Sequence, residues 1–368
     1  MAVYIHQLPG WPSFKWNADR LNLLLIEVRH QQGKLLGNMQ HIGFALQSEA
    51  TLQTLTLDVL KSGEIEGELL DADQVRSSIA RRLGMDIAGL IPADRNVEGV
   101  VEMMLDATQQ YNTPLTAERL YSWHASMFPS GRSGMHKIVV GAWRDNPPHD
   151  PMQVVSGAAG KEKIHYQAPA AELLPDEMNK FLYWFNTADN IDPVLKAAVA
   201  HLWFVTIHPF DDGNGRIARA ITDMQLTRAD GTTQRFYSMS AQIRKERNAY
   251  YDILEQTQQG SMDITDWLEW FLRCISRAIH TSEEQLSVIF KKAGFWKQYS
   301  AITFNMRQVL LLNKLLDGFE GKLTSSKWAK IAKCSHDTAL RDIQDLLNKK
   351  VLVNDVGGGR STGYLLKT

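Results

Sequence analysis

The chain has few cysteines, almost no net charge and no long apolar run, and each shortage excludes a class of protein. Its two cysteines, Cys274 and Cys334, lack metal-ligand spacing, so we expect neither a disulfide framework nor a zinc site, only buried thiols in a reducing compartment. Its 40 Lys and Arg residues offset 41 Asp and Glu residues, and the formal net charge of −1 gives no overall attraction to nucleic acid or membranes.

Signals for export and for membrane insertion are lacking as well. Residues 1–6 show no charged segment followed by an apolar core, as a signal peptide would. The longest apolar run, residues 194–207, contains Lys196 and His201 and is too short to span a bilayer. We therefore expect a cytoplasmic protein that makes no membrane contact.

What the chain does have is helical periodicity along most of its 368 residues, which leave room for two or three domains. Asn17 is a candidate N-cap for a helix over residues 17–36. Residues 194–207 are apolar all round, which indicates a buried helix. Further helices are predicted at residues 50–60, 71–106 (with breaks near 84–86 and 91–93), 115–128, 173–186, 216–228 and 263–280.

One segment has a different pattern. Residues 137–140 and 153–155 are rich in β-branched side chains and are separated by Asp-Asn-Pro-Pro at residues 145–148. A β-hairpin that ends at residues 163–166 fits this pattern. The predicted fold class is therefore mainly α with one hairpin inserted before the buried helix.

The chemistry is concentrated in residues 208–219, His-Pro-Phe-Asp-Asp-Gly-Asn-Gly-Arg-Ile-Ala-Arg. His208 precedes a proline, which disfavours the α conformation, so the preceding helix should end there. A helical pattern resumes at Arg216. The turn therefore lies at a helix N-terminus, where free backbone N–H groups and the helix dipole favour an anion.

Four side chains of this run suit phosphate chemistry. His208 titrates near neutrality and can accept a proton from an attacking hydroxyl. Asp212 is a hard oxygen ligand of the kind that magnesium takes when it bridges phosphates. Arg216 and Arg219 lie three residues apart, on one helix face, where they can hold successive phosphates.

The centre of the turn suits an anion too. Gly213 and Gly215 let the backbone approach a phosphate closely, and the side-chain amide of Asn214 can donate a hydrogen bond to it. Alone, a glycine-rich turn of this kind would be an ordinary connection between two helices.

Residues 208–219 match every fixed position of H-x-F-x-(D/E)-G-N-G-R-x-x-R, so the chain resembles the Fic (filamentation induced by cAMP) family of protein adenylyltransferases. The resemblance implies a Fic-type helical core and transfer of AMP from ATP to a Ser, Thr or Tyr hydroxyl of a target protein. His208 would be the general base, Phe210 would anchor the loop in the core, and Asp212 would bind Mg²⁺. Arg216 would contact the β-phosphate and Arg219 the γ-phosphate.

The same resemblance gives Gly213, Asn214 and Gly215 the role of an anion hole for the α- and β-phosphates. It also places residues of the ATP site further along the chain, where Tyr250, Tyr251 and Gln258 would line the adenine pocket. From their spacing alone, tyrosines on one helix face are as well explained by core packing.

Residues 62–67, Ser-Gly-Glu-Ile-Glu-Gly, match the inhibitory pattern (S/T)-x-x-x-E-(G/N) that lies N-terminal to the core in some Fic proteins. In isolation the run would only end a helix and expose its charges. The resemblance implies that Glu66 pairs with Arg219 and blocks the γ-phosphate position, with Ser62 and Gly67 completing the motif. Ser62 and Glu66 would lie one turn apart on a helix, with the hydroxyl of Ser62 left to support the loop.

The predicted hairpin corresponds to the flap with which Fic proteins hold a target segment by strand addition. Ile164 and His165 would be flap residues. On the residues alone, the hairpin is equally a surface β-ribbon.

The end of the chain resembles a winged helix-turn-helix. The expected elements are helices at residues 306–316, 326–332 and 336–349 and strands at residues 351–353 and 364–366, joined by a glycine-rich wing at residues 357–361. Its lysines suit phosphate contacts, whereas Asp337, Asp342 and Asp345 on the proposed recognition helix oppose DNA binding. A DNA partner, a protein partner and a homodimer therefore stay open.

These patterns divide the chain into four parts. We expect an N-terminal helical region with the inhibitory helix at residues 1–112, a Fic catalytic domain at residues 113–280, a helical connector at residues 281–300 and the winged helix-turn-helix at residues 301–368.

The leading interpretation is a Fic adenylyltransferase that Glu66 inhibits. One alternative keeps the enzyme but has Glu66 position a water molecule for removal of AMP, which would make the protein a de-AMPylating or bifunctional enzyme. A second alternative is an ATP-sensing, DNA-binding regulator. The target protein, for which the chain itself is one candidate, cannot be identified from the residues.

Overall fold

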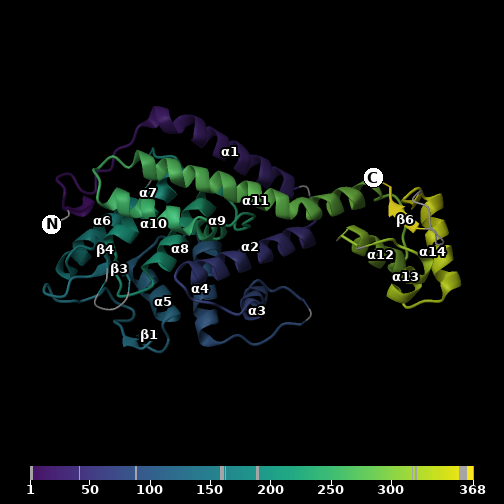
Figure 1. Ribbon diagram of the computed structural model, residues 1–368, viewed down its shortest axis with the longest axis horizontal. Coiled ribbons are helices and arrows are strands. Elements are labelled where there is room, and N and C mark those ends of the chain that lie inside the picture. Colours follow the sequence, from purple (N-terminus) through teal and green to yellow (C-terminus); the bar gives the residue numbers. More distant parts are fainter. Residues whose placement is uncertain are drawn as a thin grey trace. The chain divides into compact units, whose positions relative to one another are not determined.

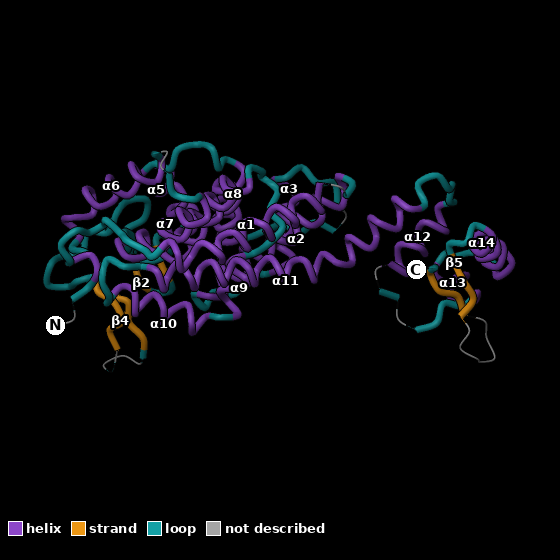
Figure 2. The backbone as a smooth tube through the Cα atoms, turned by 90° about the horizontal axis from the view of Figure 1, so that it is seen from above, coloured by secondary structure: helices purple, strands orange, loops and turns teal. Residues whose placement is uncertain are grey.

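Helices make up most of the computed structural model, as the apolar periodicity predicts (Figures 1 and 2). The structure describes residues 3–40, 42–87, 89–157, 161, 163–187, 190–316, 318–319, 321–355 and 363–367. It divides into two compact units, Met1–Glu283 and Glu284–Thr368, and helix α11 (Thr265–Gln298) contributes residues to both. The finer domain boundaries stay a prediction.

The N-terminal helices are those expected from the sequence, but two of them are longer. They are α1 (Ala18–Gln40), α2 (Phe44–Ile65), α3 (Ala72–Arg82), α4 (Arg95–Gln109) and α5 (Ala117–Met127), preceded by a short 3-10 helix, η1 (Ile5–Gln7). Helix α2 ends where Gly67 adopts a positive φ of 85°. Asp71, Asp94 and Thr116 each cap the next helix with a side-chain oxygen that accepts from a backbone N–H three residues on.

The centre of the first unit is the helix pair that flanks the motif. It consists of α7 (Pro193–Ile207) and α8 (Asn214–Asp230), packed against each other (Figure 1). The whole of residues 194–207 is buried, as predicted. Two of its polar residues have partners, because His201 is bonded to Thr222 at 2.9 Å and to Tyr250 at 2.8 Å, and Lys196 donates to the carbonyl of Thr187 at 2.7 Å.

Four further helices surround this pair. They are α6 (Leu174–Asn186), which follows a 3-10 turn, η2 (Ala171–Leu173), then α9 (Met239–Lys245), α10 (Arg247–Gln258) and the first part of α11. Helix α2 packs against α9, and α1 runs along α11, where Arg20 pairs with Asp266 at 2.8 Å (Figure 1). The end of α2, which carries the predicted inhibitory motif, therefore lies beside the helices that flank the site.

The predicted hairpin is present as β3 (Gln153–Ser156) paired antiparallel with β4 (Lys163–Gln167), shown as orange strands in Figure 2. The predicted strand over residues 137–140 is wrong for most of its length. Strand β2 (His136–Lys137) pairs with β1 (Arg132–Ser133) and then ends. The backbone N–H of Val139 donates instead to Asp211 Oδ2 at 2.8 Å, so the motif loop takes the hydrogen bond that a strand would need.

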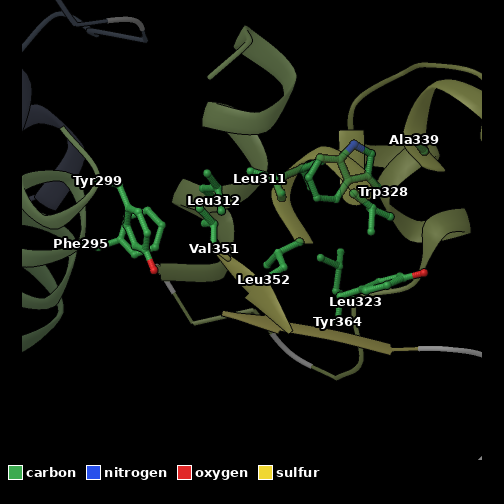
Figure 3. Packing of buried hydrophobic residues seen from close by; sticks show 12 residues of the cluster. Phe295, Tyr299, Leu311, Leu312, Leu323, Trp328, Ala339, Val351, Leu352 and Tyr364 are labelled. Carbon is green, nitrogen blue, oxygen red and sulfur yellow. The ribbon is translucent and has the colours of Figure 1, made fainter. Parts of the chain in front are cut away.

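The second unit has its own core. Its elements are α12 (Met306–Leu316), α13 (Ser325–Ile331), α14 (His336–Asn348) and an antiparallel pair, β5 (Leu352–Asp355) and β6 (Gly363–Leu366). Figure 3 shows Trp328 packed among Leu311, Leu312, Leu323 and Leu352. This order of elements matches the prediction, while the winged-helix assignment and its partner stay predictions, and the expected wing at residues 357–361 lies outside the described residues.

Two of the three acids that oppose DNA binding have basic partners inside this unit. Asp342 pairs with Arg307 at 2.7 Å, and Asp345 pairs with Lys349 at 2.6 Å. Among the two cysteines, Cys274 is buried as expected, whereas Cys334 is half-buried. In the described part of the chain, no helix combines the length and the apolar composition that crossing a membrane would require.

Candidate active site

The site is built on the loop between α7 and α8. His208 ends α7 with φ 53° and ψ 58°, a left-handed conformation that a non-glycine residue rarely adopts. It leaves the α region as predicted, but not for the extended conformation usual before proline. Such a conformation costs about 1–3 kcal/mol and persists where the surroundings fix it, which is often at functional sites.

A buried arginine that the sequence reasoning missed fixes this loop. Arg144 donates from Nε to the carbonyl of His208 at 2.8 Å, and its backbone N–H donates to the carbonyl of Pro209 at 2.9 Å. Its remaining nitrogens bind Asn146 and the carbonyl of Pro169. Nothing in the local pattern marks Arg144, because His208, whose carbonyl it binds, lies 64 residues away from it in the chain.

Phe210 and Asn214 hold the loop from inside. Phe210 is fully buried and stacks on His124 with ring centroids 4.2 Å apart, as the anchoring role requires. Asn214 donates from its amide to the carbonyl of Phe210 at 2.8 Å and accepts from the N–H of Phe210 at 3.0 Å. The loop thus uses the oxygen and one N–H of the amide, and donation of the second N–H to a phosphate stays a prediction.

The protonation of His208 follows from its surroundings. Its Nδ1 lies 3.2 Å from the carbonyl oxygen of Val205, which can only accept, so Nδ1 carries the proton and Nε2 keeps a lone pair. Loss of hydration, only partly offset by this bond, lowers the pKa of His208 to about 4. The imidazole is thus uncharged at neutral pH and has a nitrogen that can accept a proton.

Asp212 is the exposed carboxylate of the loop. Its side chain is 43% exposed, accepts from the hydroxyl of Ser133, and accepts from the N–H of Gly213 at 2.5 Å. Among the described residues, no three His, Cys, Asp or Glu side chains form a cluster that could hold a metal ion. A lone, half-exposed carboxylate fits a magnesium ion that takes its other ligands from phosphates and water.

The anion site is predicted at the start of α8. Gly213 has a φ of 82°, and a Cβ there would lie 3.0 Å from the ring of Phe128, so glycine is needed on both counts. Gly215 faces the acidic segment, since a Cβ at that position would lie 2.1 Å from Glu66 Oε1. The carboxylate of Glu66 therefore occupies the space directly beside the first turn of α8.

Arg219 is held by the predicted motif. Its Nη1 lies 2.8 Å from Glu66 Oε1, and its Nε donates to Ser62 Oγ at 2.8 Å. We expected the Ser62 hydroxyl to stay free to support the loop. It binds the arginine directly instead. Burial lowers the pKa of Arg219, yet Glu66 together with Tyr250 and Tyr251 outweighs it and the net shift is upward, so the guanidinium stays charged.

Arg216 is held too, by a residue that the sequence reasoning did not assign. Its Nη1 binds the carboxylate of Glu68, and its guanidinium lies 5.0 Å from the centre of the Phe128 ring. In the sequence, Glu68 is only one more acid directly after the run Ser62–Gly67.

Of the three predicted adenine-pocket residues, one borders the site and two lie in the core. The hydroxyl of Tyr251 lies 3.4 Å from Glu66 Oε2, so this residue borders the site. Tyr250 is bonded to His201, and Gln258 donates to Thr206 Oγ1 at 3.3 Å, both within the core. The adenine role stays a prediction for all three.

The two predicted flap residues differ in exposure. Ile164 is 46% exposed on β4, whereas His165 is half-buried. His165 is bonded through Nδ1 to Glu255 of α10 at 2.5 Å and through Nε2 to Ser156 at 2.6 Å. These bonds fasten the hairpin to the helix that carries Tyr251.

Sequence comparisons agree with this geometry. The Fic/DOC family pattern matches residues 114–226, and a domain of unknown function (DUF4172) matches residues 4–85. The chain is similar to a "Protein adenylyltransferase Fic" of Nematostella vectensis, 36% identical over 113 residues, which are 30% of this chain and 25% of that protein. It is similar to the Aedes aegypti protein of the same name, 26% identical over 268 residues, which are 71% of this chain and 48% of that protein. The chain thus spans between a quarter and about half of the length of these two relatives.

Solved structures show the same fold. A Fic family protein from Desulfovibrio desulfuricans aligns with a TM-score of 0.57 at 19% identity and covers 97% of this chain and 98% of its own. A Fic domain containing signaling protein from Bacteroides thetaiotaomicron aligns with a TM-score of 0.53 at 21% identity, over 73% of this chain and 97% of its own. The chain thus contains a Fic/DOC domain at residues 114–226, which include the His208–Arg219 loop.

Proposed function

We propose that this protein is an adenylyltransferase that moves AMP from ATP to a Ser, Thr or Tyr hydroxyl of a target protein, and that Glu66 keeps it inactive at rest. One observation carries the proposal. A single loop joins a neutral histidine with an open Nε2 to a helix N-terminus with two buried arginines. The names of the two relatives, both "Protein adenylyltransferase Fic", support it.

The reaction assigns a task to each part of this loop. His208 Nε2 takes the proton of the target hydroxyl as the hydroxyl oxygen attacks the α-phosphorus. The new oxygen–phosphorus bond forms, the bond from the α-phosphorus to the bridging oxygen breaks, and pyrophosphate leaves with the electron pair. The backbone N–H groups at the start of α8, together with Arg216 and Arg219, stabilise the negative charge that develops on the phosphates.

Asp212 is the residue that would hold magnesium next to these phosphates. A bound magnesium ion would neutralise phosphate charge and help to orient the nucleotide. Ser133 and the N–H of Gly213 orient the Asp212 carboxylate through hydrogen bonds.

The resting state follows from the Glu66–Arg219 ion pair of 2.8 Å. A carboxylate in the position of the terminal phosphate forces ATP to bind with its α-phosphate out of line for attack. Loss of this alignment alone suppresses a reaction on the order of 10²-fold. Activation therefore means that Glu66 leaves Arg219.

Mass spectrometry separates this proposal from its alternatives. The protein and a cell lysate are incubated with ATP and magnesium, with His208→Ala as the matched control, and intact and digested proteins are weighed. An AMP adduct that depends on His208 supports transfer. Loss of a pre-formed adduct without any gain supports removal by Glu66, and no change in either direction supports a nucleotide sensor, so each of these contradicts the proposal.

A further inference from the structure

The acidic segment after α2 binds both arginines of the motif. Glu66 binds Arg219, and Glu68, two residues later, binds Arg216. Arg219 and Arg216 are 1% and 5% exposed, whereas the side chains of Glu66 and Glu68 are 32% and 34% exposed, so each ion pair joins a buried guanidinium to a partly exposed carboxylate. The second pair goes beyond the inhibitory contact proposed above.

The backbone of the segment is fixed so that both carboxylates point into the site. Gly67 has a φ of 85°, and the N–H of Glu68 returns to the carbonyl of Gly63 at 3.0 Å. A Cβ on Gly63 would lie 3.0 Å from the carbonyl oxygen of Glu68, so the turn is closed tightly on the end of α2. Arg247 of α10 donates to the carbonyl of Ile65 at 2.8 Å and anchors the turn from the other side.

Arg216 is not fully satisfied by Glu68. Its Nε is buried and has no hydrogen-bond partner among the described residues. A buried guanidinium with an unused donor is costly unless another acceptor joins it. A phosphate offers more acceptor oxygens than the carboxylate does, and it can engage two guanidinium nitrogens at once.

We propose that Glu66 and Glu68 together imitate two consecutive phosphates and compete with the nucleotide at both arginines. The inference rests on the proposed function, which places the β-phosphate on Arg216 and the γ-phosphate on Arg219. Glu68 then opposes every nucleotide that has a β-phosphate, ADP included. Glu66 opposes only a nucleotide with a γ-phosphate, so the two glutamates act on different ligands.

This difference gives a direct test by calorimetric titration of the full-length chain with ADP and with ATP. The variants are Glu68→Ala, Glu66→Ala, the double variant and a control, Glu64→Ala. Glu64 belongs to the same segment but pairs with Lys61 and Arg244, outside the motif. Loss of one competing ion pair should tighten binding about three- to tenfold.

The expected pattern is specific. Glu68→Ala tightens both ADP and ATP, Glu66→Ala tightens ATP and leaves ADP unchanged, and Glu64→Ala matches the wild type for both. Glu68→Gln, which keeps the shape of the side chain without its charge, shifts ADP in the same direction by a smaller factor.

Three results would overturn the inference. If Glu68→Ala binds ADP like the wild type but binds ATP more tightly, Glu68 only supports Glu66, and the proposed function survives. If all three single variants tighten ADP equally, the effect is one of general charge. If neither nucleotide binds any variant, the double variant included, the inference and the proposed function fall together.

Discussion

His208 shows how far the environment of a residue can move it from its ordinary chemistry. From sequence alone its imidazole was expected to titrate near neutrality. In the folded chain the loss of hydration lowers its pKa to about 4, and the carbonyl of Val205 holds the proton on Nδ1. The side chain is therefore a neutral base over the whole physiological range, although a weak one.

The pH dependence of activity should reveal this shift. Below its pKa, His208 is protonated and cannot accept a proton, so kcat/KM for AMP transfer should fall as the pH drops through about 4. Between pH 6 and 8, kcat/KM should not change through titration of His208. The measurement is a pH–rate profile of the Glu66→Gly variant, and a half-maximal point near 6.5 would contradict the account.

Single residues of the loop were partly predictable. The glycines, His208 and both arginines stand at the positions that the motif requires, and Phe210 is buried as expected. The structure adds a task that the sequence does not indicate for Asn214, because its amide binds Phe210 in its own loop. Its phosphate role stays a prediction.

At the scale of elements, the most demanding contact is the crossing of α4 and α5. A Cβ on Gly99 of α4 would lie 1.8 Å from the carbonyl oxygen of Ser126, which is backbone and cannot move aside alone. Gly99→Ala should therefore lower the free energy of unfolding by about 3 kcal/mol. The urea midpoint measures this loss.

Gly33 of α1 is the matched control for that substitution. A Cβ there meets nothing within 4 Å, and the residue is exposed in a helix interior. Gly33→Ala should raise the free energy of unfolding by up to about 1 kcal/mol. Equal effects of the two substitutions would show that helix propensity, and not the close crossing, controls stability.

The elements themselves were largely predictable, whereas their mutual contacts were not. Capping residues located the starts of α3, α4 and α5 closely, because this signal is local, whereas α2 (Phe44–Ile65) is twice as long as the predicted residues 50–60. Residues 138–140 carry a strand pattern, but the backbone N–H of Val139 donates to Asp211 of the loop, 72 residues away in the chain. Glu68 and Arg216 lie 148 residues apart in the chain, so no local sequence pattern predicts that they pair.

At the scale of the whole molecule, the two units have separate hydrophobic cores. Trp328 lies at 0% exposure in the core of Glu284–Thr368. Trp328→Ala should destabilise that unit by about 3–5 kcal/mol and leave AMP transfer unchanged. Scanning calorimetry should show two transitions, of which only the one that belongs to this unit moves to lower temperature. A single transition that shifts as a whole would contradict separate cores.

Control of the site by Glu66 is tested most directly by incorporation of label from α-labelled ATP. The wild type, Glu66→Gly and the double variant Glu66→Gly/His208→Ala are incubated with magnesium and a cell lysate. Because Glu66 is 2.8 Å from Arg219, its removal should raise labelling on the order of 10²-fold, and the loss of His208 should abolish the labelling again. Equal labelling of wild type and Glu66→Gly would contradict the account.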